Sequence, residues 1–223
     1  MTAHINRVTI NDTANGPGIR VVVWFQGCEH HCKHCHNPET WNPKKGIPLT
    51  IPQIGQILDA CDKPYIAGIT LSGGDPFHPM NEWAALNLIL SFRRRFKQTK
   101  TIWVWTGYTW EELEDKEEQL GYFNMMSSPI SMVDVLVDGK FIEEQKDISL
   151  PYCGSKNQRV IDVVKSIGKN KVVLWQQDSL KPVKGIKQKI FNYLKGVLRT
   201  LQVMTFSPLK TPSSPASGQT SSN

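Results

Sequence analysis

Residues 27–37 read Gly-Cys-Glu-His-His-Cys-Lys-His-Cys-His-Asn, so Cys28, Cys32 and Cys35 have the spacing C-x3-C-x2-C directly after an apolar stretch. Thiolates are strong ligands of soft metals, and a loop that carries three of them can surround one metal centre. A closed zinc site needs four protein ligands, and a 4Fe-4S cluster normally has four cysteines. Three cysteines therefore predict a metal centre with one open position, where a substrate or cofactor could bind.

The composition is that of a globular protein. The chain has 223 residues, of which 39% are hydrophobic and 21% charged, which predicts one well-packed domain with an appendage. The first residues lack the apolar segment of a signal peptide, and the apolar run at residues 21–25 is too short for a membrane span. We therefore expect a cytoplasmic protein with no membrane association. In that compartment clustered cysteines are metal ligands rather than disulfides, whereas the isolated Cys61 and Cys153 are expected to be inert thiols.

The positive charge is confined to one end of the chain. Residues 1–164 hold 16 basic and 19 acidic residues, a net charge of −3, whereas residues 165–223 hold 10 and 1, a net charge of +9. The electrostatics of the first part therefore give no reason to expect a nucleic-acid partner. We divide the chain into a main domain, 1–164, and a basic extension, 165–223. Residues 181–201 are expected to form a solvated amphipathic helix, and residues 206–223 to be disordered.

Strand-like and helix-like patterns alternate along the main domain. Apolar runs predict strands at residues 19–26, 66–71, 101–105 and 132–137, and helical spacing predicts helices over 51–61, 81–96 and from 109 onward. Residues 1–17 are polar and turn-rich and predict no element, while 159–164 and 171–175 are candidates for further strands. This order predicts an α/β fold: a parallel sheet with alternating helices, open or partly closed like a piece of a β/α barrel.

Distinctive loops follow the four predicted strands. They are the cysteine loop, Ser72-Gly73-Gly74-Asp75-Pro76, Thr106-Gly107-Tyr108 and Asp138-Gly139-Lys140. Because the carboxyl ends of parallel strands meet at one edge of a sheet, these loops should share one mouth. Glycines let a ligand approach the backbone closely, and exposed amides or a nearby carboxylate can hold the charged ends of an amino acid. Trp103 and Trp105 are expected in the core, whereas the position of Tyr108 relative to the mouth stays open.

The motifs resemble the radical S-adenosylmethionine superfamily. Within it the chain is similar, over about residues 5–164, to the glycyl-radical activases that serve the anaerobic ribonucleoside-triphosphate reductase. The resemblance lies in the cysteine loop and in residues 15–20 (Asn-Gly-Pro-Gly-Ile-Arg), 71–76 (Leu-Ser-Gly-Gly-Asp-Pro), 102–108 (Ile-Trp-Val-Trp-Thr-Gly-Tyr) and 135–141 (Val-Leu-Val-Asp-Gly-Lys-Phe). It implies a partial, open barrel of the radical S-adenosylmethionine type and an oxidoreductase activity.

The resemblance also implies cofactors, partners and residue roles. The cluster ligands would be Cys28, Cys32 and Cys35, and the fourth iron would bind S-adenosylmethionine. The nucleoside would lie beside His34, Cys35 and His36, and the methionine end would lie beside Gly73, Gly74 and Asp75. Reductive cleavage would yield methionine and a 5′-deoxyadenosyl radical, which takes a hydrogen from a glycine on the large reductase subunit. An electron donor such as flavodoxin is implied, and no side chain of this protein is expected to be catalytic.

Two other functions are compatible with parts of the sequence. The chain could activate another glycyl-radical enzyme, such as pyruvate formate-lyase. Alternatively, His30, His31, His34 or His36 could complete a zinc knuckle in a module that binds nucleic acid through the basic extension. The motifs outside the cysteine loop favour the iron–sulfur interpretation.

Overall fold

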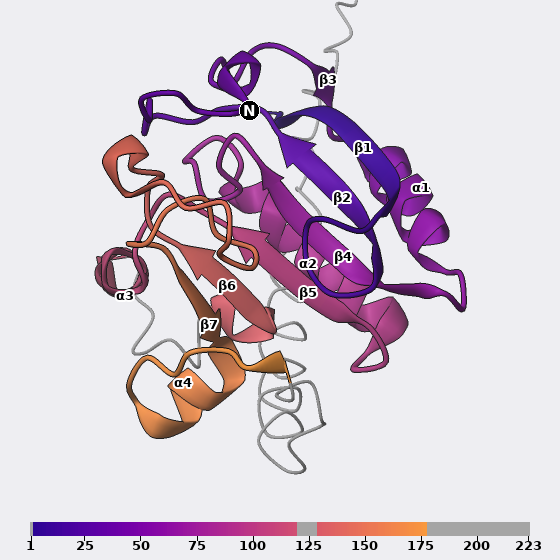
Figure 1. The fold of residues 1–223 in the computed structure, drawn as a ribbon. Coiled ribbons are helices and arrows are strands. Elements are labelled where there is room, and N and C mark those ends of the chain that lie inside the picture. Colours follow the sequence, from indigo (N-terminus) through magenta and orange to yellow (C-terminus); the bar gives the residue numbers. More distant parts are fainter. Residues whose placement is uncertain (1, 120–128, 178–223) are drawn as a thin grey trace, which may run out of the picture.

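The computed structural model describes residues 2–119 and 129–177, which contain a seven-stranded sheet in the order β3-β1-β2-β4-β5-β6-β7 (Figure 1). The strands are β1 His4–Asp12, β2 Ile19–Phe25, β3 Ile47–Pro48, β4 Ile66–Gly73, β5 Thr101–Trp105, β6 Val135–Asp138 and β7 Arg159–Asp162. The helices are α1 Ile51–Cys61, α2 Glu82–Phe96, α3 Trp110–Gln119 and α4 Val163–Lys169. Short 3-10 turns cover Pro38–Thr40, Pro129–Met132 and Glu143–Gln145.

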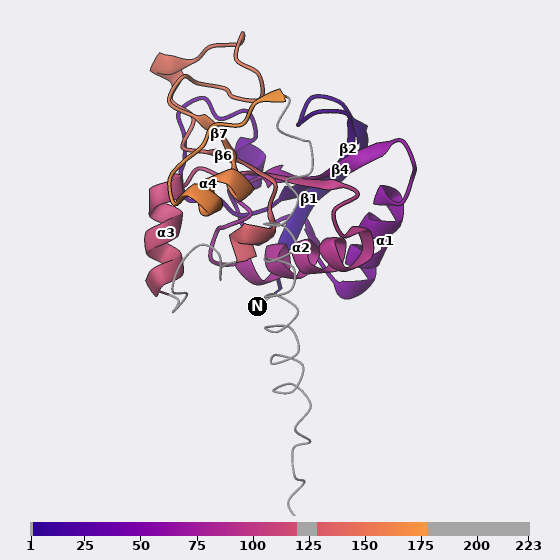
Figure 2. The same ribbon diagram turned by 90° about the horizontal axis from the view of Figure 1, so that it is seen from below.

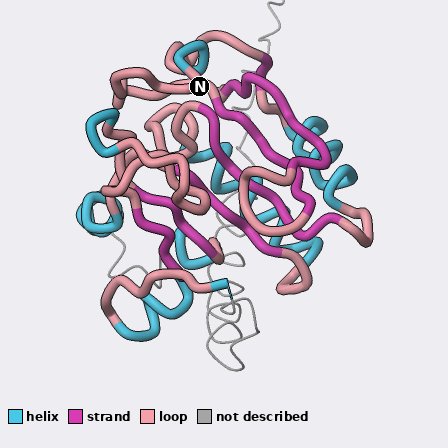
Figure 3. The backbone as a smooth tube through the Cα atoms, viewed as in Figure 1, coloured by secondary structure: helices cyan, strands magenta, loops and turns pink. Residues whose placement is uncertain are grey.

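The sheet is mixed and open (Figure 3). Strands β2, β4, β5 and β6 are parallel neighbours, as the alternating pattern predicted. The other strands pair antiparallel: β1 with β2 and β3, and β7 with β6. The predicted parallel sheet is therefore correct for the centre and wrong for the flanks. The sheet ends at β3 and β7, so the fold is mixed α/β with a sheet that does not close.

Strand β1 contradicts the expectation that residues 1–17 form no element. It pairs with β2 over most of its length, for example Val8 with Val23. Ile5 is buried, but Ile10 is 55% exposed, so the apolar alternation is weak. Strand β1 lies next to the two-residue edge strand β3, so much of its surface stays in water. It forms because it is hydrogen-bonded to β2, and a sequence pattern does not reveal this pairing.

Helix α1 has the predicted bounds, Ile51–Cys61. Pro52 lies in its first turn, and Thr50 and Gln53 form a capping box, which satisfies amides that have no partner within the helix. Helix α2 follows Asn81, but the amide of Asn81 makes no cap and instead donates to the carbonyl oxygens of Gln26 and Asp75 at 2.7 and 2.8 Å. This residue therefore ties the start of α2 to the ends of β2 and β4.

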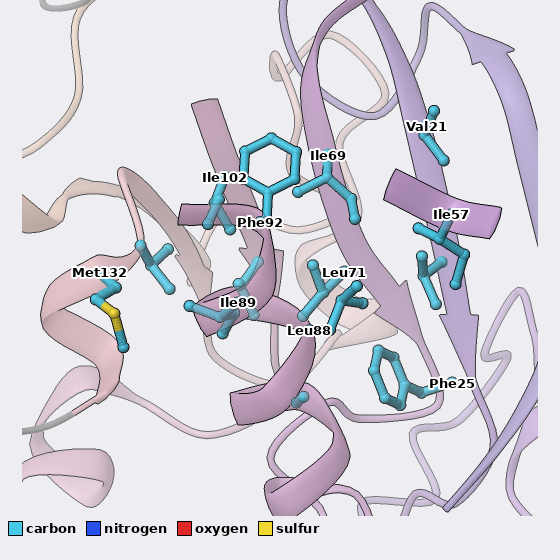
Figure 4. Close-up of a cluster of buried hydrophobic side chains, with 14 of the residues drawn as sticks. Val21, Phe25, Ile57, Ile69, Leu71, Leu88, Ile89, Phe92, Ile102 and Met132 are labelled. Atoms are coloured by element: carbon cyan, nitrogen blue, oxygen red, sulfur yellow. The ribbon is translucent and has the colours of Figure 1, made fainter. Parts of the chain in front are cut away.

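Each face of the sheet has its own apolar cluster. Helices α1 and α2 cover one face (Figure 2), where Phe25, Leu71 and Ile102 from the strands pack with Leu88 and Phe92 of α2 (Figure 4). The opposite face carries an aromatic group made of Trp103, Trp105, Tyr152 and Trp175. Trp103 is fully buried, which confirms its expected core position. Trp105 is only partly buried and packs against it, with ring centroids 5.6 Å apart.

The last described residues differ in part from the predicted strands. The strand expected at 159–164 ends at Asp162, whose side chain accepts a 3.0 Å bond from the amide of Lys165 and so caps α4. The strand expected at 171–175 is reduced to one isolated bridge between Leu174 and Ile161. The predicted helix at 181–201 and the predicted disorder at 206–223 lie outside the described residues. In the described part of the chain, no helix is long and apolar enough to cross a membrane.

Arg20 is a buried cation that joins three strands. Its side chain donates to the hydroxyls of Thr70 and Thr101 at 2.8 and 2.9 Å, and to the carbonyl oxygens of Pro17, Ile69 and Thr101 at 3.3, 2.7 and 3.1 Å. Burial lowers the pKa of Arg20 to about 10, which leaves the guanidinium charged at neutral pH. All five donors of the planar guanidinium are thus used, between the starts of β2 and β5 and the middle of β4.

We expect Arg20→Lys to lower the free energy of unfolding by roughly 2–4 kcal/mol, because an ammonium group cannot reach the same acceptors and leaves several of them buried without a donor. Urea denaturation followed by circular dichroism measures this loss. Arg94→Lys, on the exposed part of α2, serves as the matched control. Equal stability of the two variants would contradict the assigned role of Arg20.

Candidate metal centre

The loops that follow the parallel strands meet at one end of the sheet, at the upper left of Figure 1. Phe25 at the end of β2 pairs with Gly73 at the end of β4. Beyond this pair, the amide of Gly74 donates to the carbonyl oxygen of Phe25 at 2.8 Å, and the amide of Asp75 donates to that of Gly27 at 2.7 Å. The loops after β2 and β4 therefore lie against each other, as predicted.

Three free thiols lie in the cysteine loop, residues 27–37. Cys28, Cys32 and Cys35 are half-buried, and none is in a disulfide. The backbone N–H of Asn37 donates to the sulfur of Cys35 at 3.4 Å, and the backbone amides of His30 and Phe141 oppose the rise in the pKa of Cys28 and of Cys32. Backbone N–H groups stabilise negative charge on sulfur, so the surroundings of these cysteines suit thiolate ligands.

Burial changes the acidity of these thiols. It raises the pKa of Cys28 to about 12, against the opposing effect of the His30 amide, and it also raises the pKa of Cys32. In the metal-free chain the thiols of Cys28 and Cys32 are therefore protonated at neutral pH. A metal must displace their protons, as is usual for thiolate sites.

The donor set fits a 4Fe-4S cluster held through three irons. Such a cluster takes one thiolate on each iron, so its protein ligands do not converge on a single ion. Within residues 2–119 and 129–177, no group of three or more His, Cys, Asp or Glu side chains is arranged to hold one metal ion. Three free thiols on one loop, each with its own N–H donor, supply the ligands and the charge stabilisation that three irons require.

Two glycines bring the loop after β4 against the start of the cysteine loop. Gly73 has φ +104°, and a Cβ atom there would lie 2.5 Å from the amide nitrogen of Phe25. A Cβ atom at Gly74 would lie 2.4 Å from the carbonyl oxygen of Gly27. Since Cβ atoms do not approach backbone atoms this closely, only glycine allows this contact. The role of both glycines beside a methionine group remains a prediction.

The carboxylate of Asp75 is buried and already bonded to the protein. Its Oδ1 accepts from the amide of Phe77 at 2.8 Å, and its Oδ2 accepts from the amide of Gly107 at 2.8 Å. The hydroxyl of Thr106 lies 3.0 and 2.9 Å from the two oxygens, and Nε2 of His30 lies 2.8 Å from Oδ2. These bonds show that the carboxylate of Asp75 joins neighbouring loops of the protein. Its predicted contact with the methionine end of a cofactor stays a prediction.

His34 and His36 lie next to the segment that follows β6. His34 has φ +57°, and its largely exposed ring places Nδ1 at 3.4 Å from Oε1 of Glu143. The ring centroid of His36 lies 5.7 Å from that of Phe141, at a tilt of 41°. The structure thus brings both histidines beside the segment that follows β6, and their predicted contact with a nucleoside stays a prediction.

Sequence reasoning gave no specific role to several residues at the mouth. Tyr108 donates from its hydroxyl to Oε1 of Glu29 at 2.6 Å, and its ring meets that of His30 edge-on at 4.6 Å. Tyr108 therefore faces the cysteine loop, a question that the sequence left open. The position of Thr106-Gly107-Tyr108 after a strand indicated the mouth, but no sequence signal indicated the partners of these residues.

A protein family described as a 4Fe-4S single cluster domain matches residues 14–161 of the chain. The matched region contains the four parallel strands and the cysteine loop. Fold, donor set and family match together define a protein with a domain for one 4Fe-4S cluster.

Proteins similar in sequence to this chain identify its family within this class. Proteins called "Anaerobic ribonucleoside-triphosphate reductase-activating protein" are similar to this chain in Vibrio cholerae (41% identity, 66% of this chain and 90% of the relative), in Enterobacteria phage T4 (37%, 70% and 91%) and in Escherichia coli K12 (40%, 67% and 92%). The chain belongs to the family of anaerobic ribonucleoside-triphosphate reductase-activating proteins.

Proposed function

We propose that this protein activates the anaerobic ribonucleoside-triphosphate reductase by reductive cleavage of S-adenosylmethionine at a 4Fe-4S cluster, which generates a glycyl radical on the large reductase subunit. The observation that carries the proposal is the set of three half-buried, free thiols, each with a backbone amide at its sulfur. The names of its relatives support the choice of the reductase as partner. The four parallel strands support a partial barrel of the radical S-adenosylmethionine type.

The residues of this chain would bind and orient the cluster and S-adenosylmethionine. Cys28, Cys32 and Cys35 would hold three irons and leave the fourth for S-adenosylmethionine. The nucleoside would contact His34, Cys35 and His36, and the methionine end would contact Gly73, Gly74 and Asp75. The bound cluster supplies the electron that breaks the sulfonium carbon–sulfur bond. The loops at the mouth keep water and other hydrogen donors away, and no side chain of the protein transfers the hydrogen.

The proposal includes the cellular compartment, the electron donor and the division of the chain into domains. The free thiols suit the reducing cytoplasm, where an electron donor such as flavodoxin would supply the cluster. The activase domain proposed for residues 1–164 agrees with a family match that ends at residue 161. Helix α4 crosses the proposed boundary, and Trp175 packs with the aromatic group of the sheet. Residues 165–223 would be an extension, for which we expect neither a nucleic-acid nor a membrane partner.

Anaerobic reconstitution tests the function. We expect brown protein with about four irons per chain, which forms methionine and 5′-deoxyadenosine with dithionite and S-adenosylmethionine. Addition of the large reductase subunit should produce a glycyl radical in electron paramagnetic resonance. One zinc per chain without cleavage would contradict the proposal. A glycyl radical on pyruvate formate-lyase, with none on the reductase, would mean that this protein activates another glycyl-radical enzyme.

A further inference from the structure

One buried contact links the cysteine loop to the loop after β4. His30 lies between Cys28 and Cys32 in the sequence, its side chain is 5% exposed, and its Nε2 lies 2.8 Å from Oδ2 of Asp75, which is 1% exposed. A carboxylate can only accept, so the imidazole donates. A buried hydrogen bond to a charged group is stronger than one between neutral groups, which makes this contact a firm attachment for the loop.

The carboxylate that receives this bond is itself held in place. The amides of Phe77 and Gly107 and the hydroxyl of Thr106 all donate to it at 2.8 to 3.0 Å. A carboxylate has about four acceptor sites, and these donors together with His30 occupy them. Asp75 is therefore a fixed point that joins the loops after β2, β4 and β5.

The imidazole of His30 is also confined on its sides. A Cβ atom at Gly107 would lie 2.2 Å from Cδ2 of His30, so the ring packs against bare backbone. Tyr108 covers another side, with its ring centroid 4.6 Å away, and bonds through its hydroxyl to Glu29. The ring cannot leave this position without losing the bond to Asp75 and the contact with Tyr108.

The backbone of the same residue reaches a predicted cluster ligand. The amide of His30 is the N–H group that acts on the sulfur of Cys28. Hydrogen bonds to the sulfurs are among the factors that set the reduction potential of an iron–sulfur cluster, and residues that orient ligands tune a metal centre. Fixing the side chain of His30 therefore fixes a donor at the cluster.

We propose that His30 and Asp75 form a positioning pair, in which Asp75 holds the imidazole of His30 and thereby directs the backbone amide of His30 at the sulfur of Cys28. This inference rests on the proposed function, because it takes Cys28 as a cluster ligand. In this role both side chains act on the position of the cysteine loop and not on reacting atoms. Its effect is to make the cluster easier to reduce and to keep Cys28 in place before the metal binds.

The reduction potential of the reconstituted protein, measured without S-adenosylmethionine, tests the pair. We expect His30→Ala to bind iron normally but to hold about a tenfold smaller ratio of reduced to oxidised cluster at a fixed potential, which for one electron is about 59 mV. His30→Gln should recover most of this loss, because its side-chain amide can donate to Asp75. Arg95→Ala breaks exposed contacts of α2 with Asp59 and Asp62, outside the cysteine loop, and should leave the potential unchanged. An unchanged potential in His30→Ala would overturn the inference.

Asp75→Asn separates positioning from cofactor binding. If Asp75 acts through His30, the variant lowers the potential without S-adenosylmethionine, and the double variant with His30→Ala shows no further shift. If Asp75 acts only by binding the methionine group, the potential stays that of the wild type and the affinity for S-adenosylmethionine falls. The second result would overturn the pair.

A measurement on metal-free protein distinguishes a failure of the pair from a failure of the proposed function. We expect iodoacetamide to label Cys28 about tenfold faster in His30→Ala than in the wild type or in Arg95→Ala, as read by peptide mass spectrometry, because the half-buried thiol is released. If labelling of Cys28 is faster in His30→Ala but the protein never binds iron, the positioning role of His30 and Asp75 stands and the proposed cluster function is contradicted. Unchanged labelling would reject the pair whatever the iron content.

Discussion

Alanine at any one of Cys28, Cys32 and Cys35 is expected to abolish iron binding and S-adenosylmethionine cleavage together. Each thiolate would serve a different iron, and no other cysteine lies in the loop to replace it. Mutation of residues that only orient metal ligands typically lowers metal affinity or activity by about 10–100-fold. When a ligand itself is lost, we therefore expect the rate of S-adenosylmethionine cleavage to fall by at least about 100-fold. Iron analysis, the visible absorbance of the reconstituted protein and the yield of 5′-deoxyadenosine measure the effect.

Cys61 provides the matched control for this prediction. It is fully buried in the core at the end of α1, and burial raises the pKa of its thiol to about 12, so it is an inert side chain. Cys61→Ala should keep its iron and its cleavage activity, and lose only about 1 kcal/mol of stability from the small cavity. Loss of the cluster in Cys61→Ala would show that the ligands are assigned wrongly.

Alanine at Gly74 is expected to produce the second largest loss of activity. The new methyl group would lie 2.4 Å from the carbonyl oxygen of Gly27, which directly precedes Cys28. The loop after β4 must then move away from the cysteine loop, and a displacement of about 1 Å at a reaction centre can cost roughly 100-fold in rate. The measurement is S-adenosylmethionine cleavage at saturating dithionite, with iron content recorded for the same preparation.

Gly55 is the control for Gly74. It lies within α1, and a Cβ atom there would meet nothing within 4 Å. Gly55→Ala should therefore keep full activity and gain about 0.5–1 kcal/mol of stability, as expected for alanine in the interior of a helix. Cleavage by Gly74→Ala at the rate of Gly55→Ala would mean that the close approach of the two loops is unnecessary.

The parts of the fold that follow from local patterns could be predicted from the sequence. The bounds of α1 and of β5 were predicted correctly, because helical spacing and a short apolar run are properties of neighbouring residues. Residues 109–112, Thr-Trp-Glu-Glu, have the capping-box pattern, and at the start of α3 the amide of Thr109 donates to Glu112 at 2.7 Å. The order of these elements led correctly to the parallel centre of the sheet.

The elements that depend on a distant partner were missed. Strand β1 has a half-exposed face and no clear alternation, so only its pairing with β2 makes it a strand. Strand β7 runs antiparallel to β6, a direction that no local pattern specifies. These two strands turn the expected parallel sheet into a mixed one.

The sequence by itself determined the chemistry of this protein: three cysteines at a fixed spacing, glycines after the second parallel strand, and the place of both at one end of a sheet. Only the tertiary structure decided which groups serve these cysteines. His30 and Asp75 are separated by 45 positions, and the amide at Cys32 comes from Phe141. Ligand spacing is a property of one short loop, whereas contacts between loops depend on the register of several parallel strands. That register is set by the packing of the whole sheet.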